Sequence, residues 1–127
     1  MELCNQPGIR TYLTRGGVPW AWSFSLTGHA ALTFLDDVYL DKVFLSVTGL
    51  GAERGATTLK TDEALVYRKM LKQAKKVIVG ADSSKLGRVS SAFICPTTGM
   101  HVLITNAGAP DEALTAFERR GIKVIRA

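Results

Sequence analysis

An unbroken run of β-branched residues occupies positions 77–79 of this 127-residue chain. Consecutive apolar residues of this kind predict a strand buried on both faces, which is typical of a parallel sheet covered by helices. The run ends at Gly80, and Asp82, Ser84 and Lys85 follow closely. Ligands of open α/β sheets bind beyond the carboxyl ends of the strands. These residues are therefore candidates for binding a polyhydroxylated anion, or they form only a polar turn that caps its own backbone.

The remaining pattern predicts an α/β domain in which strands and helices alternate. Further strands are expected at residues 42–48, 102–105 and 123–125, with shorter extended segments at 9–14, 24–26 and 91–95. Helices are expected at residues 29–39, 61–75 and 110–120, and in the second of them Tyr67, Met70, Leu71 and Ala74 form the expected buried stripe. This order predicts a mostly parallel, Rossmann-like sheet flanked by helices.

Two more polar segments follow predicted strands. The glycine-rich residues 49–55, which begin at Gly49, are a candidate phosphate-binding loop, although their spacing fits neither the dinucleotide nor the P-loop motif. Thr57 and Thr58 come directly after them. Thr105 and Asn106 close the strand at residues 102–105. Because parallel strands bring their carboxyl ends to one edge of the sheet, we expect these segments to line one pocket with Lys85.

Composition limits the class of protein. A net charge of +5 and a pI near 9.5 suit an anionic partner, either a sugar phosphate or a nucleic acid. The two cysteines, the lack of a secretion signal and the lack of a membrane-length apolar run favour a cytoplasmic protein that does not enter a membrane. No metal ligand set, cofactor motif or Ser/His/Asp set is present, because the two histidines have no neighbouring acids.

From about residue 8 onward, six segments recur in the order and spacing of a known family. They are Leu13-Thr14-Arg15-Gly16-Gly17, Ser25-Leu26-Thr27-Gly28, Asp41-Lys42-Val43-Phe44-Leu45, Gly55-Ala56-Thr57-Thr58, Ala81-Asp82-Ser83-Ser84-Lys85-Leu86-Gly87-Arg88, and Leu103-Ile104-Thr105-Asn106. The chain thus resembles the C-terminal effector-sensing domain of the DeoR family of bacterial transcriptional repressors. The resemblance implies an isomerase/CoA-transferase-like α/β fold that binds a phosphorylated sugar or a related metabolite.

The chain departs from the pattern of that family in three ways. The winged helix-turn-helix that binds DNA would lie upstream, and so would the first strand–helix–strand of the sensor domain with its phosphate loop. We therefore expect residues 1–127 to form a single sensor domain that is incomplete at its N-terminus, and to contact DNA only through the absent winged helix. In addition, Asn106 and Thr48 each stand where the family usually has aspartate.

The resemblance also bears on catalysis. The related ribose-5-phosphate isomerase carries an Asp-Gly-Ala-Asp turn, and the matching positions here, residues 48–51, contain no acid. Proton transfer between sugar carbons needs a carboxylate base, so we expect a sensor and not an enzyme. Lys85 matches the lysine that contacts the sugar phosphate. The alternatives are an isomerase that uses Glu53 or Glu63, or an oligomerisation module without a working ligand site.

The expected ligand site consists of nine residues: Gly17, Gly49, Thr57, Thr58, Asp82, Ser84, Lys85, Thr105 and Asn106. Gly17 belongs to it because paired glycines let the backbone approach a ligand closely, although they also suit a simple turn. Trp20 and Trp22, on one face of an extended segment, predict a contact between subunits, and we expect a homo-oligomer.

Overall fold

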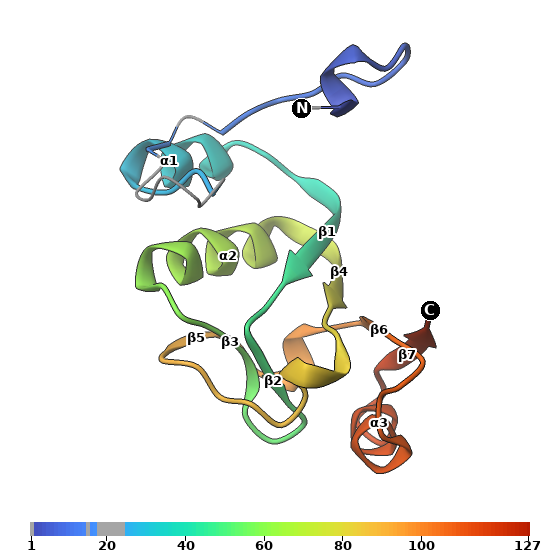
Figure 1. Ribbon diagram of the computed structural model, residues 1–127. Helices are drawn as coiled ribbons and strands as arrows, with labels where there is room; N and C mark the ends of the chain where they lie inside the picture. Colours follow the sequence, from blue (N-terminus) through green and yellow to red (C-terminus); the bar gives the residue numbers. More distant parts are fainter. Residues whose placement is uncertain (1, 15, 18–24) are drawn as a thin grey trace.

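The structure, a computed structural model, describes residues 2–14, 16–17 and 25–127. A four-stranded parallel sheet in the order β1-β4-β6-β7 forms its centre (Figure 1). Its strands are β1 (Leu40–Ser46), β4 (Ala74–Gly80), β6 (Val102–Thr105) and β7 (Lys123–Arg126). The helices are α1 (His29–Asp36), α2 (Thr61–Gln73) and α3 (Asp111–Glu118), with short 3-10 turns η1 (Glu2–Asn5), η2 (Ser83–Lys85) and η3 (Thr97–Gly99). The predicted α/β fold with a parallel sheet flanked by helices is confirmed.

A second, antiparallel sheet occupies the place of the predicted glycine-rich loop. It contains β2 (Gly49–Gly51), β3 (Gly55–Thr58) and β5 (Ala92–Cys95), in the order β2-β3-β5. β2 and β3 form a hairpin in which Gly51 pairs with Gly55. The prediction of a loop at residues 49–55 was therefore wrong. Glycine is uncommon in strands, so the sequence did not indicate β2 and β3, but Leu50 is completely buried and holds β2 in the core.

The described part of the N-terminal segment contains no strand at residues 9–14, so that prediction was also wrong. Ile9, Tyr12 and Leu13 are all exposed there, and no neighbouring strand pairs with them. The pairing nearest to the predicted segment at 24–26 is an isolated bridge between Gly17 and Thr27. Residue 24 itself lies outside the described residues.

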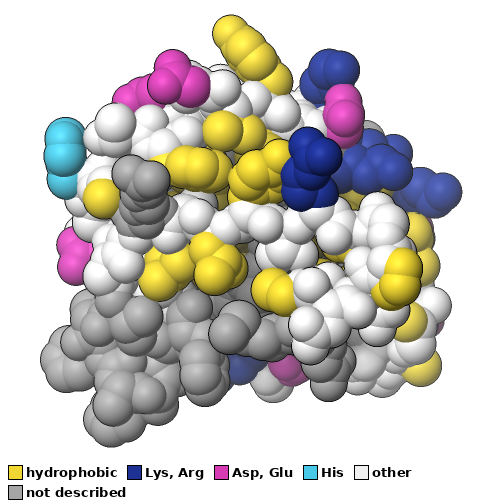
Figure 2. Space-filling model, turned by 90° about the horizontal axis from the view of Figure 1, so that it is seen from above, with side chains coloured by type: hydrophobic (Ala, Val, Ile, Leu, Met, Phe, Trp, Pro, Cys, Tyr) yellow, Lys and Arg dark blue, Asp and Glu magenta, His cyan; other side chains and the backbone are white. Residues whose placement is uncertain are grey.

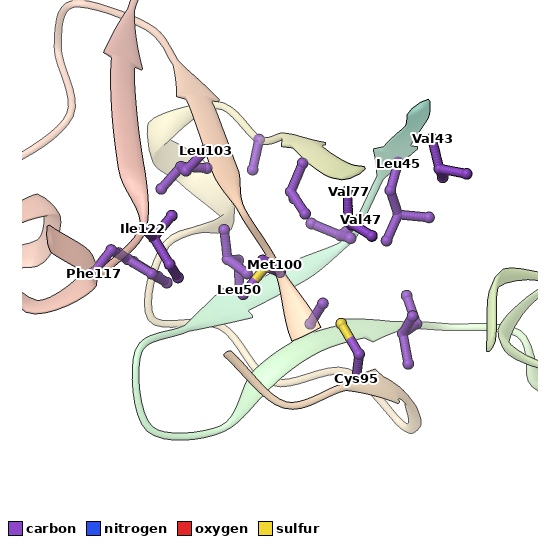
Figure 3. Packing of buried hydrophobic residues seen from close by; sticks show 14 of the residues in the cluster. Val43, Leu45, Val47, Leu50, Val77, Cys95, Met100, Leu103, Phe117 and Ile122 are labelled. Atoms are coloured by element: carbon purple, nitrogen blue, oxygen red, sulfur yellow. The ribbon is translucent and has the colours of Figure 1, made fainter. Parts of the chain in front are cut away.

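The hydrophobic core lies between the parallel sheet, the small sheet and the helices α2 and α3 (Figure 3). Its largest completely buried side chains are Phe117, Leu50, Leu103 and Val79. Helix α2 differs from the prediction, because Ala64 and Val66 are its buried residues, whereas the predicted stripe is only half-buried. The reason is that α2 packs on two sides: Ala64 contacts the main core, and Val66 packs against Ala31 and Leu35 of α1.

Apolar side chains are also found at the surface. Phe44 of β1 alternates with the buried Val43 and Leu45, so it points to the opposite face of the sheet, where it is 70% exposed. Hydrophobic side chains gather on the side of the molecule seen in Figure 2, with Lys and Arg side chains at one edge. Trp20 and Trp22, the basis for the predicted subunit contact, lie outside the described residues. Among the helices that the structure describes, none has the length and apolar content needed to cross a membrane.

Candidate functional site

A cavity of about 510 Å³ opens where the chain leaves β1 and β4. The residues that line it come from the start of the β2–β3 hairpin, from the end of that hairpin and from the segment after η2: Thr48, Leu59, Lys85, Arg88, Val89, Ser90 and Ser91. Its volume falls within the range of about 300–1,000 Å³ that is usual for small-molecule sites. The cavity is therefore large enough for a small metabolite, and it lies beyond the end of β1 and beside η2.

Residues 85–88 form a type II β-turn at the wall of this cavity. Leu86 has φ −67° and ψ 130°, Gly87 has φ 79°, and the amide of Arg88 donates a hydrogen bond to the carbonyl of Lys85 at 3.3 Å. The third position of this turn requires a positive φ, which explains the glycine. The first and last Cα atoms of such a turn lie within about 7 Å of each other. The turn thus brings Lys85 and Arg88 to the same cavity.

The turn is fixed to strand β2. The amide of Gly87 donates to the carbonyl of Leu50 at 2.8 Å, and Leu86 forms an isolated parallel bridge with Leu50. Gly49 allows this close approach, because a Cβ atom there would lie 2.7 Å from the carbonyl oxygen of Arg88 and 2.6 Å from Thr57 Oγ1. Gly49 therefore has a structural role in the site: it makes room for the turn that carries the cations.

Hydroxyl groups connect the hairpin to the segment beyond the turn. The buried Thr57 donates from Oγ1 to the carbonyl of Gly49 at 3.2 Å and accepts from the amide of Ser90 at 2.9 Å. Thr48 Oγ1 and Ser90 Oγ lie 2.8 Å apart. Thr57 thus supports the cavity wall from behind, while the hydroxyls of Thr48 and Ser90 belong to residues that line it. Thr58 is also buried, and its hydroxyl donates to Glu63 Oε2 at 3.4 Å.

We expect Thr57→Val to lower the free energy of unfolding by about 1–3 kcal/mol, because the half-buried amide of Ser90 loses its acceptor and the buried hydroxyl of Thr57 is removed. Urea denaturation measures this change. Thr115→Val on α3 is the control, because its hydroxyl bonds only to the helix carbonyl of Asp111, and it should change stability by no more than about 0.5 kcal/mol. Equal stabilities of the two variants would show that the Thr57 hydroxyl does not hold the wall.

Asp82 and Asn106, both predicted to bind the ligand, are hydrogen-bonded to the backbone of η2. Asp82 Oδ1 accepts from the amide of Ser84 at 2.8 Å, and Asn106 Oδ1 accepts from the amide of Ser83 at 2.6 Å, so both side chains cap η2. Hydrogen bonds from the hydroxyl and the amide of Ser84 hold the pKa of the Asp82 carboxyl below its ordinary value. The carboxylate is therefore ionised at neutral pH, and it is directed to its own turn.

Asp82, Thr105 and Asn106 line a separate, smaller hollow of about 220 Å³. Thr105 is buried there, and its Oγ1 has no hydrogen-bond partner among the described residues. Asp82 thus lines one hollow and Lys85 the other, so the structure does not place all the predicted residues around a single space. Ser84 is exposed within η2 and is not among the residues that line either hollow, and Gly17 pairs with Thr27 ahead of α1.

Arg88, Thr48, Ser90 and Ser91 line the larger cavity although they were absent from the predicted site. For Arg88 a sequence signal did exist, since Leu-Gly at the centre of Lys85-Leu86-Gly87-Arg88 fits a type II turn. For Ser90 and Ser91 no local signal existed, because their position depends on the hydrogen bonds to Thr57 and to the carbonyl of Leu59.

The described residues that line the cavity include two cations and several hydroxyls, and they offer no acid–base chemistry through a carboxylate. None of the described lining residues is acidic. Glu53 forms an ion pair with Arg120, and Glu63 lies 3.6 Å from the ammonium of Lys60; neither carboxylate lines the cavity. Across residues 2–14, 16–17 and 25–127, no group of His, Cys, Asp and Glu side chains could hold a metal ion.

Comparison with known proteins agrees with this picture. Residues 1–107 match the model of the family described as the DeoR C-terminal sensor domain. The chain is 33% identical to a protein of Escherichia coli O157:H7 that is provisionally named as an aga operon transcriptional repressor, over 97% of the chain and 45% of that protein. It is 32% identical to the HTH-type transcriptional repressor GlcR of Bacillus subtilis, over 97% of the chain and 47% of that protein. The chain thus spans about half the length of these relatives.

Proposed function

This chain belongs to the family of DeoR C-terminal sensor domains, and from that premise we propose that it binds a phosphorylated sugar or a related anionic metabolite as the effector of a transcriptional repressor. The observation that carries the proposal is the cavity at the carboxyl ends of β1 and β4, where Lys85 lies beside the hydroxyls of Thr48 and Ser90. A cation and several hydroxyls suit a ligand that has an anionic group and several hydroxyls of its own.

The proposed role is regulatory and not enzymatic. It is supported by the names of the relatives, which are transcriptional repressors, and by the engagement of Glu53 with Arg120 and of Glu63 with Lys60. In this proposal the domain works in the cytoplasm without a cofactor, as part of a homo-oligomer. DNA is contacted by a helix-turn-helix in the half of the relatives that this chain does not match.

Calorimetric titration of the protein with phosphorylated sugars, and with the same sugars lacking phosphate, tests the proposal. We expect at least one phosphorylated sugar to bind and its unphosphorylated counterpart to bind far more weakly, because the ammonium of Lys85 contributes only to the former. If no phosphorylated sugar binds more tightly than inorganic phosphate, the proposal is wrong. Ketose formation from ribose 5-phosphate that Glu53→Gln abolishes would instead support the isomerase.

A further inference from the structure

Two cations, Lys85 and Arg88, line the same cavity, and the nearest acid along the chain, Asp82, lines a different hollow and accepts from the amide of Ser84, although it lies close enough to feel the charge of Lys85. The described lining residues include no carboxylate, and neither the Lys85 ammonium nor the Arg88 guanidinium forms an ion pair with a residue in the described part of the chain. Like charges held at the two ends of one β-turn repel each other. An anion that binds between the two charges relieves this repulsion.

We propose that Arg88 is a ligand-binding residue and that it acts together with Lys85 as a clamp on one dianionic phosphoryl group. This inference rests on the proposed function and adds to it the charge of the group that is recognised. A phosphate monoester carries a charge of about −1.5 to −2 at pH 7, which matches the two cations. A carboxylate carries a single charge and would leave one cation uncompensated. The clamp therefore selects sugar phosphates over sugar acids.

The backbone of Arg88 is already fixed before a ligand arrives. Its amide donates to the carbonyl of Lys85, its own carbonyl packs against Gly49, and two residues later the amide of Ser90 donates to Thr57 Oγ1. Only the side chain is free to adjust. The planar guanidinium can donate two parallel hydrogen bonds to a phosphoryl group, whereas the lysine supplies a compact charge. A pre-positioned backbone lowers the entropy that is lost when the ligand binds.

The test uses inorganic phosphate and acetate as probes, titrated at pH 8 and followed by NMR shifts of the amides of Ser90 and Lys85. Arg88→Ala is expected to weaken phosphate binding about tenfold and to change acetate binding less, so that the preference for phosphate shrinks. Arg54→Ala is the matched control. Arg54 is exposed in the turn of the β2–β3 hairpin and is not among the residues that line the cavity, and its replacement removes the same charge. The Arg54→Ala variant should bind phosphate and acetate as the wild type does, and Arg88→Lys should retain the preference for phosphate.

The outcomes separate this inference from the proposed function. If Arg88→Ala and Arg54→Ala bind phosphate equally, or if phosphate does not bind to the wild-type protein, the clamp does not exist. If sugar phosphates still bind through Lys85 while Arg88→Ala has no effect, only the inference fails. If Arg88→Ala reduces the phosphate preference but no sugar phosphate binds more tightly than inorganic phosphate, the clamp is correct and the proposed function is wrong.

Discussion

Replacement of Lys85 by alanine is expected to weaken the binding of a phosphorylated sugar by about 10- to 150-fold while the fold remains intact. The half-buried Lys85 lines the cavity, and a hydrogen bond to a charged group contributes about 1.5–3 kcal/mol, which corresponds to this range of affinities. The fold should not change, because the hydrogen bonds of the turn at residues 85–88 use backbone atoms only. Calorimetric titration and thermal unfolding of both proteins measure the two effects.

Lys76→Ala is the control for the loss of charge. Lys76 is exposed in the first half of β4, away from the carboxyl end of the strand, and it does not line the cavity. Its substitution should leave the affinity within about twofold of the wild type, because exposed charges at a distance are screened by salt. If Lys85→Ala binds the ligand as tightly as Lys76→Ala does, then Lys85 is only part of a capped turn.

Gly55→Ala is expected to lower the free energy of unfolding by about 2–5 kcal/mol. Gly55 has φ 76°, a left-handed conformation that costs an alanine about 1–2 kcal/mol. A Cβ atom at this position would also lie 2.1 Å from the carbonyl oxygen of Cys95, so the pairing of β3 with β5 must shift, and overpacking of this kind costs about 1–3 kcal/mol more. Urea denaturation with a constant m-value measures the change.

Substitutions of two other glycines measure the steric and the conformational contributions separately. A Cβ atom on Gly51, which lies in the same hairpin, would be 3.7 Å from its nearest neighbours, two atoms of Arg54, so Gly51→Ala should change stability by no more than about 0.5 kcal/mol. Gly121 has φ 79° but open space around it, so Gly121→Ala should cost only the conformational part, about 1–2 kcal/mol. A Gly55→Ala variant as stable as Gly121→Ala would contradict the steric argument.

The sequence pattern predicted the parallel sheet correctly where burial on both faces left a continuous apolar run, as at residues 77–79 and 102–105. It missed the hairpin, because three glycines in two short strands leave only Leu50 and Ala56 as apolar residues there, too few to form a strand pattern. The predicted stripe of α2 does pack against the core, but it is only half-buried, and it left out Ala64 and Val66, the buried residues of the helix. A helix that packs on two neighbours has no single apolar face, so a search for one stripe is misleading.

Candidate site residues could be predicted from the sequence only where they directly follow a predicted strand. Lys85 was predicted because polar residues after a buried strand are candidates for binding, and the structure places it at the larger cavity. The same rule selected Asp82 and Asn106, whose side chains cap η2, and local sequence cannot separate a capping role from a binding role. The local pattern can predict the turn that carries Arg88, but where that turn lies depends on a long-range contact, the hydrogen bond from the amide of Gly87 to the carbonyl of Leu50.

The hydrogen bonds that join the hairpin to the segment after the turn have a consequence for folding. The partners Thr57 and Ser90 are 33 residues apart in the sequence, and Thr48 and Ser90 are 42 apart. Helix α2 and strand β4 lie between them, so the walls of the cavity meet only when the chain loop that contains both elements has closed. A nascent or unfolded chain therefore has no cavity. If the effector binds there as proposed, it binds only the folded chain, so a higher metabolite concentration would increase the fraction of the protein that is folded.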